Sequence, residues 1–314
     1  LATGAETPNV IFDATGDALC TPARVFSTTV NHASKDAIKL LEKLPQKGKV
    51  VTIGAGNVVL DVLETLLCTP PQLDEGIPLG DAFYKARDGK VGSVEAVIRK
   101  DMYTTRFGSD QLLRTLDRIE AAGVHIAISL QDDFPPNPYE GIADIALTDE
   151  QRAAKANHTE IAEKIRFYTA DRTAPPGAQV LTLKFGQSPK WDGLREQDGH
   201  LRLSTEKVKL DRSEDRLKPK SELMGDCDPI DCNLVITCTG QKRQAIPGLE
   251  FGKAGKTSDE RVVSVGWAAE NGEGTVGHSA LTVLRAMGYV HDFISGHAPL
   301  VRDVSAALAD AKLD

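Results

Sequence analysis

Two glycines separated by a single residue, Gly54 and Gly56, lie where the sequence could bind a phosphate group. They follow a β-branched run, residues 49–53, and precede residues 57–67, whose apolar side chains recur at helical spacing. In such a strand–turn–helix unit the first glycine permits the tight turn, and the second lets a pyrophosphate approach the backbone and the helix N-terminus. The third position of the motif is Val59, where Gly or Ala is usual. The residues predicted to bind a dinucleotide are Gly54, Gly56, Asn57 and Val58.

A basic pair, Arg99 and Lys100, follows the next predicted strand, residues 93–98. Chains that bind NAD usually carry a carboxylate at this place for the ribose 2′-OH, whereas basic side chains suit the 2′-phosphate of NADP. Arg99 can donate two hydrogen bonds to a phosphate, and Lys100 can add a point charge. The pair therefore favours NADP. Two alternatives remain open: Asp101 could accept the ribose of NAD, or the pair could be an ordinary solvated loop charge.

The other reactive residue types form no pattern typical of a catalytic or metal site. Five cysteines make an odd number without a C-x-x-C motif, which argues against a disulfide framework, a dithiol centre and a four-cysteine zinc site. Cys227, Cys232 and Cys238 are close in sequence and could belong to an iron–sulfur or redox site, but Cys238 lies in a strand-like run where buried structural thiols are common. No nucleophile–base pair is recognisable, so we predict no catalytic side chain and no metal ligand.

The overall composition limits the class of protein. A length of 314 residues with 41% hydrophobic and 26% charged residues is typical of a globular chain of about two domains. The net charge of -8 argues against a nucleic-acid partner, and no apolar run approaches the roughly 18 residues of a transmembrane helix. Free cysteines and the lack of a signal-peptide pattern predict a reducing, cytoplasmic location. The start at Leu1 is expected of a fragment or a processed subunit.

Apolar periodicity predicts an α/β domain with a parallel sheet. Strands are expected at residues 49–53, 93–98 and 124–128, with helices at 57–67 and 111–121 between them. This β-α-β-α-β run is one half of a doubly wound sheet, because the crossovers are right-handed. Further expected elements are a helix at 149–172, paired antiparallel strands at 179–185 and 200–210, a loop at 211–229, a buried strand at 233–239 and a helix at 298–312.

Several stretches beyond the glycine turn match the motifs of one flavoprotein family. They are G-N-V-V-L-D-V at 56–62, the insertion at 68–90, F-G-Q-S-P at 185–189, the linker at 246–251, and Gly266-Trp267 followed by Gly274 and Gly277. With these motifs the chain resembles the adrenodoxin reductase and ferredoxin–NADP reductase family, in its glutathione-reductase-like form. The resemblance extends over nearly the whole chain.

The resemblance implies a Rossmann-like dinucleotide-binding domain inserted in a partial FAD-binding domain of the glutathione-reductase type. The implied segments are 1–44 for the C-terminal part of the FAD domain's first segment, 45–245 for the NAD(P)H domain and 246–314 for the returning FAD-domain segment. FAD and NADP are the implied cofactors, with Arg99 and Lys100 at the 2′-phosphate and an iron–sulfur protein as the electron acceptor. The residues implied to contact FAD are Thr3, Gly4, Gly266, Trp267, Gly274, Thr275, Val276 and Gly277.

Two departures from the family pattern shape the functional expectation. The G-x-G-x-x-G fingerprint for FAD would lie before Leu1, and Ala268 to Asn271 replace basic residues of the family. We therefore expect FAD to be held jointly with a further segment or subunit that carries the fingerprint. The departures also favour an alternative, a non-catalytic reductase-like scaffold within an electron-transfer complex, whereas the intact glycine turn and the basic pair favour catalysis.

Overall fold

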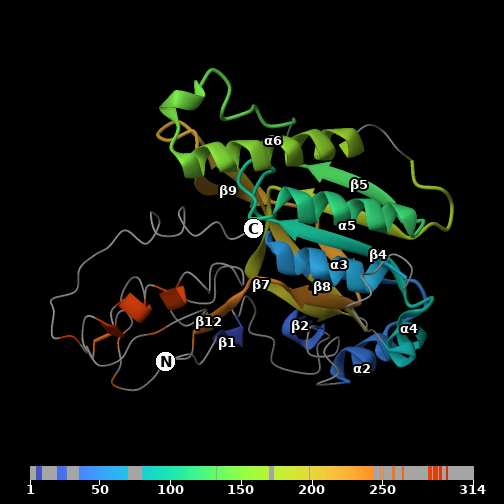
Figure 1. Cartoon of the computed structure of the whole chain (residues 1–314). Coiled ribbons are helices and arrows are strands. Elements are labelled where there is room, and N and C mark those ends of the chain that lie inside the picture. Colours follow the sequence, from blue (N-terminus) through green and yellow to red (C-terminus); the bar gives the residue numbers. More distant parts are fainter. Residues whose placement is uncertain are drawn as a thin grey trace. The chain divides into compact units, whose positions relative to one another are not determined.

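The structure, a computed structural model, describes most of the chain between residues 20 and 243 (Figure 1). The described ranges are 5–8, 20–26, 35–69, 80–131, 133–169, 173–197 and 199–243, with short stretches between 248 and 295. The chain divides into two compact units. One is Val10–Thr239, and the other joins Leu1–Asn9 to Gly240–Asp314.

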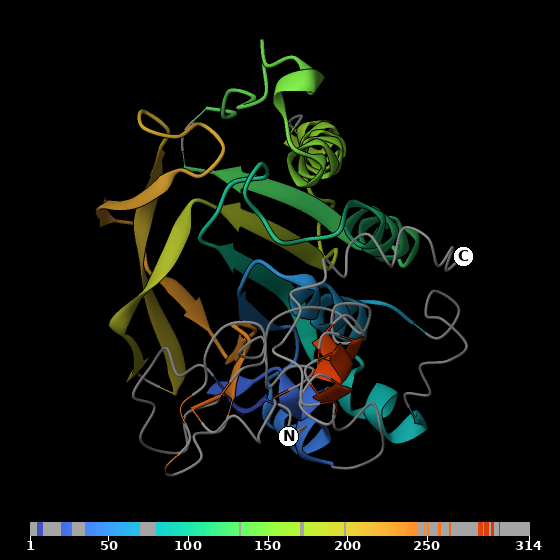
Figure 2. The same cartoon turned by 60° about the vertical axis from the view of Figure 1, so that its left-hand side comes forward.

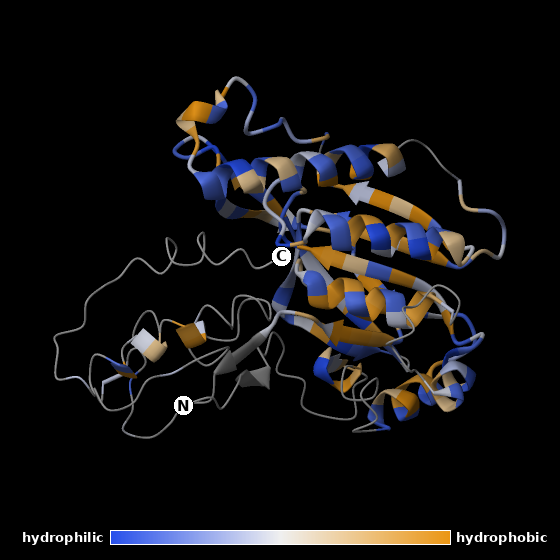
Figure 3. Ribbon diagram, viewed as in Figure 1, coloured by the Kyte–Doolittle hydropathy of each residue, from blue (hydrophilic) through white to orange (hydrophobic). Residues whose placement is uncertain are grey.

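A six-stranded parallel sheet forms the centre of the larger unit. Its strands, in spatial order, are β2 (Cys20–Pro22), β11 (Leu234–Thr237), β3 (Gly48–Ile53), β4 (Val91–Ile98), β6 (Val180–Phe185) and β5 (His125–Leu130). The central strands are predominantly hydrophobic because both of their faces are covered (Figure 3). The strands predicted at 49–53, 93–98, 124–128 and 233–239 are thereby confirmed, and so is the Rossmann-like α/β class.

Helices connect the parallel strands, as parallel pairing requires. They are α2 (Asp36–Lys43), α3 (Asn57–Leu67), α4 (Asp81–Arg87), α5 (Ser109–Ala121) and α6 (Asp149–Thr169), with a short 3-10 turn, η2, at Asp144–Ala146. The helices predicted at 57–67 and 111–121 are confirmed. The one predicted at 149–172 ends at Thr169 within the described residues, and α4 lies in the insertion predicted from the family motifs.

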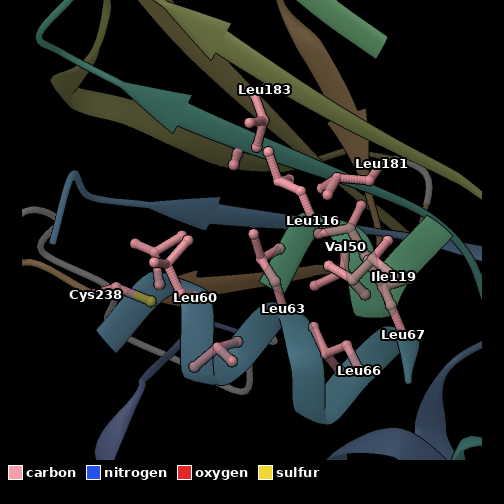
Figure 4. Packing of buried hydrophobic residues seen from close by; sticks show 14 of the residues in the cluster. Val50, Leu60, Leu63, Leu66, Leu67, Leu116, Ile119, Leu181, Leu183 and Cys238 are labelled. Atoms are coloured by element: carbon pink, nitrogen blue, oxygen red, sulfur yellow. The ribbon is translucent and has the colours of Figure 1, made fainter. Parts of the chain in front are cut away.

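The main hydrophobic core lies between the helices and one face of this sheet (Figure 4). Leu60 and Leu63 on α3 pack with Leu116 on α5 against strand residues such as Val50 and Leu183. All five side chains are at most 1% exposed. Their spacing of three or four residues along each helix places them on one side of it, which is why periodicity alone located both helices.

The second face of the parallel sheet is covered by antiparallel strands within the described residues (Figure 2). These are β7 (Gln187–Gln197), β8 (His200–Asp211), β9 (Lys220–Asp226) and β10 (Ile230–Cys232), with β8 at their centre. Val51, Val97 and Val235 from the parallel sheet pack there against Leu203 and Ile230. The unit therefore has a helical layer on one face and an antiparallel sheet on the other, where the sequence predicted a doubly wound arrangement.

The prediction that residues 179–185 pair antiparallel with residues 200–210 is wrong. β6 instead lies between β4 and β5 and is parallel to both. β8 pairs antiparallel with β7, which the sequence analysis had not identified.

The error has a physical cause in the polar face of β6. Lys184 alternates with buried apolar residues, as in a half-exposed strand, but its Nζ lies 2.6 Å from Glu95 Oε2 on β4. Lys49 Nζ lies 2.9 Å from the other oxygen of the same carboxylate. Burial alone would raise the pKa of Glu95, but the two ammonium groups outweigh burial and lower it. The alternation therefore marks a compensated charge cluster on three adjacent strands of the parallel sheet.

The segment at 211–229, predicted as a loop, contains the strand β9. Every residue of β9 is exposed, so the sequence carries no alternation of apolar and polar positions that could have indicated it. The strand exists because its backbone pairs with β8, from Glu206↔Asp226 to Asp211↔Lys220. The helix predicted at 298–312 lies outside the described residues.

The smaller unit contains a two-stranded antiparallel ribbon of β1 (Ala5–Pro8) and β12 (Gln241–Arg243). The units begin and end at other residues than the segments predicted at 1–44, 45–245 and 246–314. Residues 20–44 are grouped with the parallel sheet because β2 pairs with β11 and because Leu41 on α2 lies in the main core. Among the described residues, we find no helix that combines the length and apolarity needed to cross a membrane.

A buried carboxylate, Glu64, joins α3 to α5 and gives a test of this packing. Its Oε1 accepts a hydrogen bond from Thr115 Oγ1 at 2.6 Å, and its Oε2 lies 3.1 Å from Arg118 Nη1. We expect Glu64→Ala to lower the free energy of unfolding by about 3 kcal/mol, because it leaves a poorly exposed guanidinium without its partner. Chemical denaturation measures the loss. The control Lys39→Ala removes an exposed ion pair and should change stability by no more than about 0.5 kcal/mol; equal losses would contradict the assignment.

Candidate functional site

The candidate site lies at the carboxyl ends of three adjacent strands. In the register of the parallel sheet, Thr237 pairs with Ile53, and Ile53 pairs with Val97. The residues that follow these strands, Cys238, Gly54 and the Arg99–Lys100 pair, therefore emerge at the same edge of the sheet. In open α/β sheets, ligands bind outside this edge.

Gly54 is required by the packing of the backbone. Its φ is +150°, and a Cβ placed on it would lie 2.5 Å from the carbonyl oxygen of Cys238. Its N–H donates to Val97 O at 3.1 Å, while the N–H of Cys238 donates to Ile53 O at 2.7 Å. The turn is thus held between β4 and the end of β11, and no side chain larger than hydrogen fits there.

Gly56 is surrounded by open space. A Cβ placed on it would meet no atom within 4 Å. Gly56 is the N-cap of α3, no side chain caps that end of the helix, and the first turn carries no acidic residue. The backbone therefore presents N–H groups and the positive end of the helix dipole to an accessible space, which suits an anion. The N-terminus of α3 at Gly56 therefore fits the pyrophosphate of a dinucleotide.

The three residues after Gly56 have different environments. Val58 is 45% exposed, so it can contact a ligand at the helix end, whereas Val59 is fully buried. Val59 thus fills the position where the motif usually has Gly or Ala, and the helix still packs on the sheet. The side chain of Asn57 is engaged within the protein, because its Oδ1 accepts a hydrogen bond from Gly108 N at 3.0 Å. That bond ties the N-terminus of α3 to that of α5.

The basic pair follows β4 directly. Arg99 is exposed, and Lys100 is partly buried. Asp101, the alternative ribose ligand, is engaged in internal contacts: its Oδ1 accepts hydrogen bonds from Tyr103 N at 3.0 Å and Thr104 Oγ1 at 2.9 Å. Its Oδ2 lies 2.7 Å from Arg212 Nη2, and both side chains of this ion pair are only about 15% exposed. The carboxylate therefore shapes the loop, and both of its oxygens already have partners.

Two side chains of α6 hold the far end of the same loop. Asn157 Nδ2 donates to Phe107 O at 3.0 Å, and its Oδ1 accepts from Ser109 N at 2.6 Å. His158 Nε2 lies 3.3 Å from Thr105 O. Burial lowers the pKa of His158, so the ring is neutral at pH 7.

The hydrogen bonds of His158 define its tautomer. A carbonyl oxygen only accepts, so Nε2 donates to Thr105 O. Nδ1, 3.0 Å from the hydroxyl of Tyr139, then accepts from that hydroxyl. His158 therefore acts as a structural link between the loop and the segment that carries Tyr139, and sequence analysis gave no signal for it.

Arg106 is a second residue that sequence analysis missed. Its N–H donates to Ala55 O at 3.0 Å, and it forms an isolated parallel bridge with Gly56. The only sequence signal for it would have been a basic residue six positions after Lys100, which is too common to single out.

The cysteines behave as structural thiols. All five are free. Burial raises the pKa of Cys232 to about 12 and that of Cys238 further, so neither forms a thiolate at neutral pH. Cys227 Sγ lies 3.4 Å from Gln131 Oε1. Within the described residues, no group of three or more potential ligands could hold a metal ion, and an iron–sulfur site formed by these cysteines gains no support.

The residues implied to contact FAD cannot be placed. Thr3, Gly4, Gly266, Trp267, Gly274, Thr275, Val276 and Gly277 lie outside the described residues. Their assignment stays a prediction from the sequence.

Comparison with known proteins supports the fold. The chain is similar to solved structures of FprA, an oxidoreductase of Mycobacterium tuberculosis. Against FprA in complex with NADPH the identity is 19% and the TM-score 0.67, over 98% of this chain and 67% of FprA. Against the FprA structure that revealed a covalent modification of NADP+, the identity is 20% and the TM-score 0.66, over the same shares of the two chains.

No family model and no curated protein sequence matches the chain. The similarity is therefore one of fold. The chain shares the fold of FprA at low sequence identity, as the resemblance of its motifs led us to expect.

The two glycines of the turn should respond differently to substitution. Gly54→Ala introduces a methyl group against Cys238 O at an unfavourable φ, so we expect a loss of about 2 kcal/mol or more in unfolding free energy. Gly56→Ala points its methyl group into open space and should cost no more than about 1 kcal/mol. Urea denaturation of both variants checks this. Comparable destabilisation of the two would show that Gly56 is also held by packing.

Proposed function

We propose that the chain contains the NADPH-binding domain of an FAD-dependent reductase that passes electrons to an iron–sulfur protein. The observation that carries the proposal is the open space at Gly56, beside an uncapped helix N-terminus and one strand away from the basic pair of exposed Arg99 and partly buried Lys100. The fold shared with FprA, one structure of which contains NADPH, supports the same class of cofactor.

Different residues of the site would bind different parts of the dinucleotide. The first turn of α3 binds the pyrophosphate, because a helix N-terminus that no side chain caps offers N–H donors and the positive end of the helix dipole. Val58 contacts the cofactor from the exposed side of the helix end, and Asn57 fixes that end through Gly108. The nicotinamide and the flavin supply hydride transfer when bound, so this chain contributes position and electrostatics.

NADP is favoured over NAD by the state of Asp101. A ribose 2′-OH would need an accessible carboxylate, whereas the Asp101 side chain is only 14% exposed and both of its oxygens already accept hydrogen bonds inside the protein. Arg99 and Lys100 offer cationic groups at the same strand end, where a 2′-phosphate is expected.

FAD is assigned to the smaller unit together with a further segment. Leu1–Asn9 and Gly240–Asp314 form one unit in which β1 pairs with β12, as expected if both belong to one interrupted domain. The chain spans 67% of FprA, and the sequence lacks a second glycine fingerprint. A segment or subunit carrying G-x-G-x-x-G would complete the domain, with Thr3, Gly4, Gly266, Trp267 and Gly274 to Gly277 against the FAD.

A non-catalytic scaffold within an electron-transfer complex is the second candidate. It is favoured by Ala268 to Asn271, which stand where the family has basic residues. This candidate predicts that neither flavin nor pyridine nucleotide binds.

Replacing both Arg99 and Lys100 by Ala tests the cofactor preference. The unmodified protein should bind NADPH at least about tenfold more tightly than NADH, since each charge-assisted hydrogen bond to the 2′-phosphate contributes about 1.5–3 kcal/mol. The double variant should bind both alike. Isothermal titration calorimetry measures the ratio. As a control, the double variant Arg195→Ala with Lys209→Ala removes the same charge from the antiparallel sheet and should preserve the preference for NADPH. Equal affinities of the unmodified protein for NADPH and NADH would rule out the NADP assignment.

The visible spectrum and mass of the native preparation separate the reductase from the scaffold. A reductase should purify together with the segment or subunit that completes the FAD domain and should show the visible absorption of a bound flavin. Size-exclusion chromatography with mass spectrometry identifies the assembly. A stable monomer of this chain alone, without flavin, would favour the scaffold.

A further inference from the structure

We propose that Arg106 is a second phosphate-binding residue of the site and that it contacts the pyrophosphate, the part that NADPH and NADH share. The inference rests on the proposed function, because it assumes that a dinucleotide binds at Gly56. It adds a residue that neither the glycine motif nor the basic pair contains. Two observations carry it: the bridge to Gly56 and the fixation of the backbone around Arg106.

The bridge places Arg106 beside the turn and sets the direction of its side chain. Arg106 and Gly56 are partners in a parallel bridge, and the N–H of Arg106 donates to Ala55 O at 3.0 Å. Two residues paired in a parallel bridge project to the same side of the paired backbones, even where, as here, neither belongs to a strand. A Cβ on Gly56 points into space free of atoms within 4 Å, and Arg106 is exposed. Its side chain therefore leaves the backbone toward the same accessible side as the missing side chain of Gly56.

The backbone on both sides of Arg106 is fixed. Thr105 and Phe107 are 4% and 2% exposed, and their carbonyl oxygens accept hydrogen bonds from His158 and Asn157 on α6. Arg106 thus stands as an exposed cation between two buried residues. A charge on an immobilised backbone loses less conformational entropy on binding than one on a mobile loop.

The chemistry of the guanidinium suits this position. It is permanently charged and can donate two parallel hydrogen bonds to the oxygens of one phosphate. The helix N-terminus supplies backbone donors at Gly56, and Arg106 supplies a full charge from the loop segment bridged to it. Arg99 and Lys100 follow β4 directly and remain assigned to the 2′-phosphate. Arg106 should therefore raise affinity for both nucleotides without affecting the choice between them.

The experiment compares nucleotide binding by Arg106→Gln with that of the unmodified protein, measured by calorimetry with NADPH and with NADH. We expect both affinities to fall about tenfold or more, with the NADPH-to-NADH ratio unchanged. Arg106→Lys should recover part of the loss, because it restores the charge without the fork. Arg114→Gln removes an exposed arginine from α5 and should leave both affinities unaltered. Thermal unfolding shows that each variant is folded.

Three results would overturn the inference. Unchanged affinities in Arg106→Gln would show that the side chain does not contact the cofactor. A loss confined to NADPH would place it at the 2′-phosphate. An equal loss of affinity in Arg114→Gln would show that the effect of Arg106→Gln comes from the change in net charge and not from a contact with the cofactor. Gly56→Val distinguishes these failures from failure of the proposed function. If the folded Gly56→Val variant still binds nucleotide normally, the phosphate site is elsewhere. If Gly56→Val loses nucleotide binding while Arg106→Gln binds normally, only the role of Arg106 is refuted.

Discussion

The close approach of Gly54 to the carbonyl of Cys238 is the constraint on which the site depends. The ends of β3 and β11 meet there with room for a hydrogen atom only. This contact turns the chain sharply after Ile53, so that α3 begins at Asn57 with its N-terminus at the edge of the sheet. The open space at Gly56 and the bridge to Arg106 both follow from that turn. Fold and candidate function thus depend on the same few backbone atoms.

Local periodicity accounts for the part of the fold that could be predicted. β3, α3, β4, α5 and β5 each bury one continuous apolar face or run, and their residue order carries that information directly. β6 was assigned to the wrong sheet because Lys184 reads as a solvent-facing residue unless its partner Glu95 is known. β9 carries no apolar signal, since it is defined only by pairing with β8. Information held in pairs of distant residues is not visible in a single sequence.

In the candidate site, too, local sequence patterns were predictable and contacts between distant residues were not. Gly54, Gly56 and the basic pair were found because their types and order in a strand–turn–helix unit have a direct chemical meaning. Arg212, Asn157 and His158 were not, because they reach the loop from 50 or more residues away. Asp101 remained ambiguous in the sequence, and only its contacts show that it is an internal acceptor.

In the loop after β4, one set of residues determines the backbone conformation and another set determines the surface charge. Its shape is set by Asp101 with Arg212 and by the two side chains of α6, all of which face the protein. Its charge toward solvent comes largely from Arg99 and Arg106, whose side chains are exposed. In the proposed NADPH site, exchange of Arg99 would therefore alter the preferred nucleotide while the residues that fold the loop stay in place. The charge on the surface of this loop can thus change without a compensating change in the core.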